Sequence, residues 1–148
     1  MVGGGPLENE VRRRIQKENL NIRIVSNPSD QELVEFYQQA RCLVLPSTLR
    51  SEAFGMVQTE AMACGIPVIS TALSTGVPWV NASGVSGLVV PPGDCAALSA
   101  AVRQLDDPLL HSKLAAGALD RAERCFNAAD LFARVESLLK EAVDAEIS

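Results

Sequence analysis

The sequence has 148 residues and a mass of 15.8 kDa, which predicts a single domain large enough to bury a core. Thirteen basic and eighteen acidic side chains give a net charge of -5, and this balance argues against nucleic acid as a partner. The 47% apolar and 21% charged residues are typical of a globular protein and exclude disorder.

The chain shows no membrane or secretion signal. No apolar stretch approaches the roughly 20 residues of a membrane helix, and the N-terminus lacks the apolar segment of a signal peptide. Cys42, Cys64, Cys95 and Cys125 form no C-x-x-C pair, and we expect them to be reduced core thiols in a cytoplasmic protein. The single histidine, His111, falls on an expected surface helix, so no histidine cluster for a metal site is predicted.

The first third of the chain predicts a helix, a strand and a second helix. Apolar residues at helical spacing predict a helix over residues 6–19 with a proline at its first position. Residues 21–26 are rich in β-branched side chains and predict a short strand. Ser29 and Glu32 then form a capping box that opens a helix. The inward side chains expected on this helix are Leu33, Phe36, Tyr37 and Ala40.

The middle of the chain predicts two strands around a helix. Residues 42–46 (CLVLP) are a continuous apolar strand, as expected where helices cover both faces of a parallel sheet. A loop over 47–53 leads to a helix over 55–64, which a glycine and a proline close. The next strand covers 67–71.

The remaining chain predicts one more strand and three helices. Residues 86–94 form a strand and a turn, and Asp94 caps the helix that follows. Its expected inward side chains are Ala97, Leu98, Ala101, Val102 and Leu105. A helix over 108–124 and another that starts at Asn127 finish the chain. The apolar residues of this last helix are Leu131, Phe132, Val135, Leu138 and Leu139.

Strands that alternate with helices predict an α/β fold with a partial doubly wound, Rossmann-like parallel sheet and helices on both faces. Residues 1–5 (MVGGG) are typical of the end of a strand followed by a glycine turn. If that strand is incomplete, the sheet keeps an unpaired edge, through which we expect self-association. The glycines also allow a phosphate-binding interpretation, but the full G-x-G-x-x-G pattern is absent, and a plain tight turn is favoured.

The most informative segment is SEAFGMVQTEAMACG, residues 51–65. The free amides of Gly55, Met56 and Val57 at a helix start favour a phosphate. Glu52 before the helix and Glu60 within it are placed to border the same cleft. A carboxylate accepts paired hydrogen bonds from vicinal hydroxyls, so phosphate between two polyols indicates a nucleoside diphosphate sugar.

Both acids also have purely structural interpretations. Glu60 fits a surface glutamate on an amphipathic helix, although its small and apolar neighbours suggest a helix mostly buried against the sheet, where a charge needs a reason. Glu52 fits an acid that interacts with the helix dipole.

These residues resemble the E-x7-E signature of retaining nucleotide-sugar glycosyltransferases of the GT-B architecture, a group that includes bacterial mannosyl-, glucosyl- and rhamnosyltransferases of surface polysaccharide synthesis. The resemblance extends to VGGGPL, NIRIVSNPSDQEL, CLVLPS and SGLVVPPGDCAAL. It covers residues 1–126 and places the whole chain, 1–148, on the C-terminal, donor-binding domain of that family. The N-terminal acceptor domain would be absent, and any peripheral membrane association would run through it.

The resemblance implies roles for single residues. Glu52 would contact donor sugar hydroxyls as the catalytic-site acid, and Glu60 would hold the ribose. Ser51, just before Glu52, and Val57, further along the signature, would join the donor site. The backbone of Phe54, Gly55 and Met56 would meet the sugar and diphosphate, and the loop of Ser26, Asn27 and Pro28 would pass the nucleobase. Such enzymes typically use no metal, and the acceptor attacks the anomeric carbon on the face that the diphosphate leaves.

Two departures from the family pattern matter. No residue matches the upstream Arg and Lys that neutralise the diphosphate, so we expect the isolated chain to be inactive in transfer. Trp79 replaces the glutamate of a G-G-V-P-E-V-V run. It either packs as a structural residue or shapes the donor or acceptor pocket, and the W-V-N variant resembles some O-antigen and capsule transferases, a weak indication of mannose-type donors.

The leading hypothesis is therefore the donor-binding part of a retaining hexosyltransferase that acts on a saccharide or lipid-linked acceptor. One alternative is a non-catalytic nucleotide or sugar-nucleotide binding module. Another is a GT-B epimerase or phosphorylase relative.

Overall fold

The computed structural model describes residues 1–147, and in the last helix it describes the side chains of residues 128–130, 132, 133 and 135–140. The chain divides into two compact units, Met1–Gln39 and Ala40–Ser148. Each unit is described by itself. The assignment of the whole chain to one donor-binding domain stays a prediction.

The first unit begins with the glycine turn and helix α1 (Glu8–Lys17). This helix is shorter than predicted at both ends. Pro6 lies in the turn before it rather than at its first position. At the other end Asn19 has a φ of 50°, a left-handed conformation that asparagine tolerates and that cannot continue a helix. Arg14 and Glu18 close the last turn with an exposed ion pair.

The strand predicted over residues 21–26 is reduced to one parallel bridge between Val25 and Val2. The Val25 amide donates to the Met1 carbonyl at 2.9 Å, and the Gly3 amide donates to the Val25 carbonyl at 2.9 Å. The N-terminal residues thus pair as the end of a strand, as the sequence indicated. Val25 is the one residue of 21–26 that takes part in a bridge, so the prediction of a strand over this whole range was wrong.

Helix α2 (Asp30–Gln39) starts at the predicted capping box. The Ser29 amide and hydroxyl both donate to a carboxylate oxygen of Glu32 at 2.8 Å, and the Glu32 amide donates to the Ser29 hydroxyl at 3.3 Å. These reciprocal bonds satisfy donors that the first helical turn leaves free.

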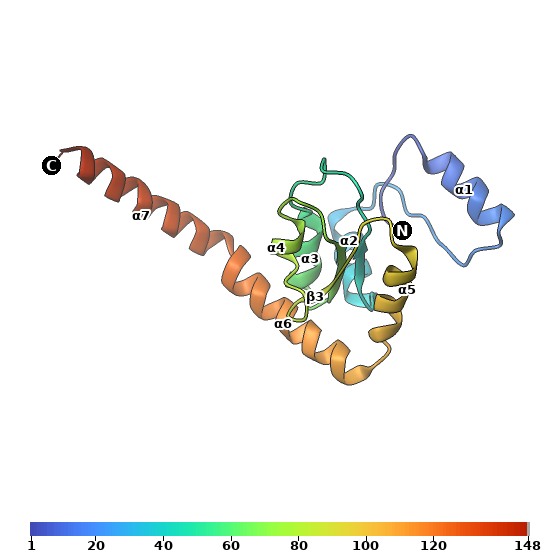
Figure 1. Cartoon of the computed structure of the whole chain (residues 1–148). Coiled ribbons are helices and arrows are strands. Elements are labelled where there is room, and N and C mark those ends of the chain that lie inside the picture. The colour runs from blue at the N-terminus through green and yellow to red at the C-terminus, as the bar shows by residue number, and fades with distance from the viewer. Residues whose placement is uncertain (148) are drawn as a thin grey trace. The chain divides into compact units, whose positions relative to one another are not determined.

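The second unit contains a parallel sheet, which among residues 1–147 has three strands in the order β1-β2-β3. Helices α3 and α4 lie on one side of the strands and α5 on the other (Figure 1). This confirms the predicted α/β class with helices on both faces. In chain order the elements are β1 (Leu43–Leu45), α3 (Met56–Ala63), β2 (Val68–Thr71), α4 (Val77–Val80), β3 (Gly87–Val90) and α5 (Cys95–Gln104).

The central strand β2 is buried along its whole length, and its side chains alternate between the two faces. Ile69 packs with Ala101 and Leu105 of α5 in the apolar core. Asp94 caps α5 as predicted, because its carboxylate accepts from the Ala97 amide at 2.8 Å. The inward position expected for Val102 is wrong: this side chain is 41% exposed, since it lies one residue past the face that Ala101 presents to the core.

The other face of β2 carries a polar network around the buried side chain of Asn81, which follows α4. Its amide nitrogen donates to the carbonyls of Val68 and Leu88 at 3.1 and 3.0 Å and reaches the Ser70 hydroxyl at 2.9 Å. Its amide oxygen accepts from the Ser86 hydroxyl at 3.1 Å. One side chain therefore ties β2, β3 and the end of α4 together. The sequence patterns gave no indication of α4, which is only one turn long.

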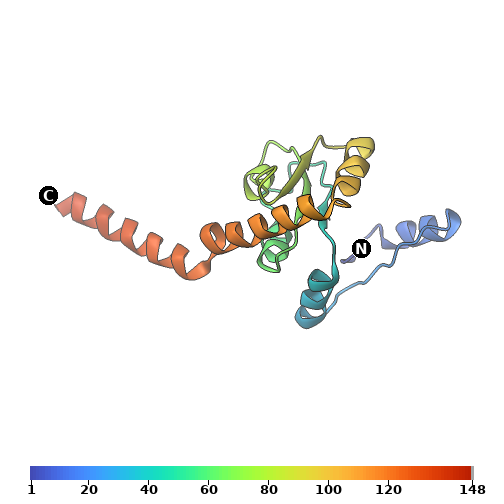
Figure 2. The same ribbon diagram turned by 90° about the horizontal axis from the view of Figure 1, so that it is seen from below.

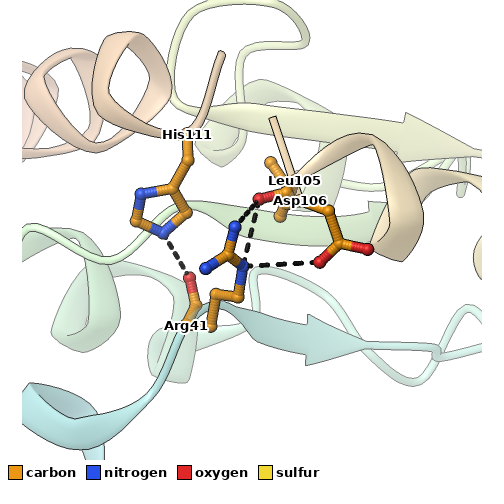
Figure 3. Close-up of polar contacts among 4 residues, drawn as sticks. All are labelled: Arg41, Leu105, Asp106 and His111. Atoms are coloured by element: carbon orange, nitrogen blue, oxygen red, sulfur yellow. Dashed lines mark hydrogen bonds and ion pairs between the residues drawn. The ribbon is translucent and has the colours of Figure 1, made fainter. Parts of the chain in front are cut away.

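The residues before β1 are tied to the corner between α5 and α6 (Pro108–Phe126) (Figure 3). The Arg41 guanidinium donates to the Leu105 carbonyl at 3.0 Å and lies 3.8 Å from the Asp106 carboxylate. Nε2 of His111 lies 2.8 Å from the Arg41 carbonyl. A carbonyl only accepts, so Nε2 carries the proton. The single histidine is thus a backbone-bonded residue at the amino end of the sheet.

Helix α6 passes beside α3 (Figure 2), and its Leu114 reaches the apolar core. After the cap residue Asn127, helix α7 (Ala128–Ile147) follows, and four of its predicted apolar residues are exposed. These are Phe132, Val135, Leu138 and Leu139, while the Leu131 side chain lies outside the described residues.

All four cysteines are free thiols. Cys42 and Cys64 are partly buried, and burial raises the pKa of the Cys42 thiol. The prediction of core thiols is wrong for Cys95 and Cys125, which are exposed because they lie in the first turn of α5 and the last turn of α6.

Replacing Asn81 by alanine should lower the free energy of unfolding by about 3 kcal/mol, because it leaves buried polar partners unsatisfied. Urea denaturation followed by the fluorescence of Trp79, the single tryptophan, measures this. The control is Asn9→Ala on exposed α1, for which we expect a change below about 0.5 kcal/mol. Equal effects of the two substitutions would contradict the structural role of the Asn81 network.

The capping box should weaken in acid. Hydrogen bonds from the Ser29 amide, and then from its hydroxyl, lower the pKa of Glu32. A lowered pKa means that the stabilisation is present above the ordinary carboxyl pKa and is lost as the pH falls through the lowered value. In Ser29→Ala, the titration midpoint of the Glu32 side-chain carbon, followed by NMR, should rise toward the ordinary range. An unchanged midpoint would show that the hydroxyl contributes nothing.

Candidate functional site

The candidate site lies at the carboxyl ends of β1 and β2, where ligand crevices form in open parallel sheets. The loop after β1 borders an open hollow of about 330 Å³. Glu52 is partly buried at this hollow, and its amide donates to the Leu49 carbonyl at 3.2 Å. The Thr71 hydroxyl at the end of β2 donates to the Ser47 carbonyl, which joins the loop to the neighbouring strand. The residues that line the hollow are Pro46, Ser47, Thr48, Leu49, Ser51 and Glu52.

Gly55 turns this loop into α3. Its φ of 73° and ψ of 65° are left-handed, and a Cβ there would lie 2.7 Å from the Leu45 side chain and 2.7 Å from Nε2 of Gln58. Only glycine fits such a position. No side chain caps α3, and in a helix the first amides, here those of Met56 and Val57, have no intrahelical acceptor. The Gln58 amide donates back to the Gly55 carbonyl at 2.8 Å.

Gln58 is a site-supporting residue that the sequence patterns did not identify. It is fully buried, and its Nε2 donates to the Phe54 carbonyl at 2.9 Å and reaches the Val77 carbonyl at 3.5 Å. Its side chain thus holds the backbone just before the helix start. The signal for it was its spacing, because Gln58 lies three and four residues before the apolar Ala61 and Met62 and so shares their face of the helix.

Phe54 and Trp79 pack together, with ring centroids 6.3 Å apart. Trp79 also lies 5.6 Å from the ring of Phe126, yet it is 59% exposed. The residue that replaces the family's glutamate is therefore an aromatic neighbour of the loop that carries Glu52. Beside it, the Gly76 amide donates to the Ala53 carbonyl at 2.8 Å.

Glu60 lies one helical turn after Met56 and is exposed. Of the two carboxylates predicted to border one cleft, Glu52 lines this hollow and Glu60 does not. The argument that Glu60 sits on a mostly buried helix is also wrong, because α3 buries only the side that carries Gln58, Ala61 and Met62. The proposed role of Glu60 rests on the resemblance.

Ser26, Asn27 and Pro28 belong to the first unit, which is described by itself. Asn27 is exposed and has a φ of 52°. Nε of Arg12 donates to the Glu8 carboxylate at 2.9 Å, and this bond lowers the pKa of Glu8 at the start of α1. A charged carboxylate there opposes a phosphate, which favours the plain-turn interpretation of Gly3–Gly5. The other residues of the predicted site, 51–60, lie together in the second unit.

Among the side chains that the structure describes, no group of three or more His, Cys, Asp and Glu is placed to hold a metal ion. No helix in the described part of the chain combines the length and the apolar character needed to cross a bilayer.

Comparison with known proteins identifies the family. Residues 1–120 match the family described as Glycosyl transferases group 1. O-antigen chain mannosyltransferase C of Escherichia coli is 42% identical over 106 residues, which are 71% of this chain and 29% of that protein. Sucrose-phosphate synthase of Thermosynechococcus elongatus has a TM-score of 0.83 at 30% identity, over 97% of this chain and 38% of that chain. HepE of Anabaena, in complex with UDP-glucose, has a TM-score of 0.80 at 23% identity, over 95% of this chain and 40% of its own.

The similarity to HepE shows the fold alone, because the identity is low. The chain spans less than a third of the length of the E. coli relative. The structural neighbours are GT-B glycosyltransferases, which confirms the fold that the sequence predicted. Because the family match covers 120 of the 148 residues, this chain belongs to the group 1 glycosyl transferases.

Proposed function

We propose that this chain is the donor-binding part of a retaining glycosyltransferase that moves a hexose from a nucleoside diphosphate sugar to a saccharide or lipid-linked acceptor in surface polysaccharide synthesis. The observation that carries the proposal is the turn at Gly55, which starts the uncapped helix α3 only four residues after Glu52, a residue that lines the hollow. An O-antigen chain mannosyltransferase among its relatives and a UDP-glucose complex of a structural neighbour support it.

The start of α3 binds the donor diphosphate in this proposal. The amides of Met56 and Val57 point from the first turn, and the helix dipole adds partial positive charge there. A diphosphate gains most from these donors as it leaves, because negative charge then accumulates on its oxygens. The backbone supplies this part of the stabilisation, and the resemblance assigns the neutralisation of the diphosphate to an Arg and a Lys of the family that no residue here matches.

Carboxylates hold the hydroxyl groups on either side of the diphosphate. Glu52, at the hollow, accepts hydrogen bonds from the donor sugar, and Glu60, one helical turn after the start of α3, accepts from the ribose. A role at the base for Ser26, Asn27 and Pro28, in the first unit, rests on the resemblance alone. The acceptor then attacks the anomeric carbon on the face that the diphosphate leaves, and the configuration is retained.

The acceptor binds to a further domain in this proposal. The E. coli relative is more than three times as long as its matched segment, which leaves room for such a domain in proteins of this family. The free thiols of the chain are typical of a reducing compartment, and we place the enzyme in the cytoplasm.

Isothermal titration of the 148-residue chain with UDP-glucose, GDP-mannose and ADP-glucose tests the donor site. We expect binding of at least one sugar nucleotide in the micromolar to millimolar range, and no hexose transfer, because no residue of the titrated chain matches the Arg and Lys that neutralise the diphosphate in the family. Absence of heat with every donor would contradict the proposed site. Substantial hexose transfer by this chain would contradict the proposal that a further domain binds the acceptor.

Glu60→Gln should weaken nucleotide binding by about tenfold and leave the melting temperature nearly unchanged. The amide replaces one acceptor by a donor, and a hydrogen bond to a charged group is worth about 1.5–3 kcal/mol. Titration with the best donor and thermal unfolding measure the two effects. The matched control is Glu123→Gln, the same charge change at an exposed position of α6. A loss of stability without a loss of affinity would favour a structural role for Glu60.

A further inference from the structure

The side chain of Phe54 belongs to a cluster of three aromatic rings, with Trp79 of α4 and Phe126 of α6. Phe126 meets both other rings edge-on, at centroid distances of 6.0 Å to Phe54 and 5.6 Å to Trp79. Edge-to-face contacts of this kind define the orientation of a ring as well as its position. The cluster brings together residues that are 25 to 72 positions apart, by the differences between 54, 79 and 126.

Arg121 holds this cluster together from α6. Its guanidinium carbon lies 5.4 Å from the ring centroid of Trp79 and 5.7 Å from that of Phe126, within cation–π distance of both. Its Nε donates to the Val80 carbonyl at 2.8 Å, and a terminal nitrogen donates to the Trp79 carbonyl. Arg121 therefore caps the last carbonyls of α4 while it stacks on the rings, and lysine lacks the planar fork that does both.

The backbone around Phe54 is held from two directions. From α3, the Gln58 side chain donates to the Phe54 carbonyl. From the segment before α4, the Gly76 amide donates to the Ala53 carbonyl, and a Cβ at Gly76 would lie 2.9 Å from that same oxygen. The ring of Phe54 adds a side-chain contact with Trp79 of α4. Arg121 in turn holds the ring of Trp79.

We propose that Arg121 and Trp79 are positioning residues of the donor site, which fix the segment Glu52–Gly55 through the ring of Phe54. This inference rests on the proposed function, because the segment it fixes carries the Glu52 carboxylate and the start of α3. Neither residue needs to touch the donor. The cluster acts by limiting the conformations of the loop before the donor arrives, so that less ordering is left for the binding step.

The exposure of the cluster distinguishes positioning from core packing. A core residue is buried, whereas Trp79 keeps more than half of its surface in solvent and Arg121 is only partly buried. Loss of these contacts should therefore change the order of the loop more than the stability of the sheet, whose apolar core lies elsewhere, around Ile69 and Leu105.

The test compares Arg121→Gln with Arg124→Gln. Arg124 lies on the same helix and pairs only with the exposed Asp120 in the contacts described, so its substitution makes the same charge change without touching the rings. The first readout is amide hydrogen exchange, followed by NMR, at Glu52, Gln58 and Gly76, whose amides donate to carbonyls of the loop. The second readout is the affinity for UDP-glucose and GDP-mannose.

We expect Arg121→Gln to speed exchange at these three amides at least fivefold and to weaken donor binding about tenfold, with a melting temperature close to that of Arg124→Gln. Arg121→Lys should give an intermediate result, and Trp79→Phe, which keeps a ring, should retain most of the protection. Exchange and affinity equal to those of Arg124→Gln would overturn the inference.

Phe126→Leu decides the question if Arg121→Gln does not fold. It removes both edge-on contacts and keeps an apolar side chain, and the same two readouts apply to it. If the unsubstituted chain binds no sugar nucleotide, the proposed function fails, and amide exchange alone then decides whether the cluster orders the loop. Slow exchange that does not respond to either substitution would refute the positioning role.

Discussion

The left-handed conformation of Gly55 is the constraint on which the candidate site depends. It ends the loop of residues 46–55 that leads from β1 past the hollow into α3, and Leu45 and Gln58 pack where any side chain at position 55 would stand. The same turn leaves α3 without a side-chain cap, so its first amides stay available to a ligand. Backbone geometry alone thus leaves uncapped helix amides at the candidate site of a chain with net charge -5.

The sheet holds this turn in a fixed position. Asn81 bonds to β2, to β3 and to the residue before β3, and this network joins the two strands to the end of α4. On the opposite face Ile69 packs against α5. The Thr71 hydroxyl then bonds to the loop after β1. A buried polar network tolerates little displacement of its partners. The position of the hollow beside Glu52 is therefore fixed by β2, to which the loop is bonded.

Local signals predicted the elements well and the contacts between them poorly. The capping residues Ser29 and Asp94 were predictable because their hydrogen bonds reach only three residues along the chain. The strand over 21–26 was overestimated because its length depends on a partner elsewhere in the sequence. Likewise, the spacing of Glu52 and Glu60 was evident, but their environments were not: one borders a hollow, and the other faces solvent on α3. Gln58 and the ring cluster are products of packing, which periodicity does not encode.

Helix α6 explains how a loop far along the sequence from the C-terminal helices comes to depend on them. Near its start, Leu114 packs into the apolar core beside Leu105, and near its end Arg121 and Phe126 meet the rings of Trp79 and Phe54. The loop before α3 is therefore attached to the sheet in two ways. It continues directly from β1, and its Phe54 ring contacts the end of α6, a helix that also packs into the core. A rigid helix transmits the position of the core to its far end at little entropic cost, since its backbone is already ordered. Two attachments restrict both the position and the tilt of the segment that carries Glu52. A single attachment through β1 would leave the tilt free.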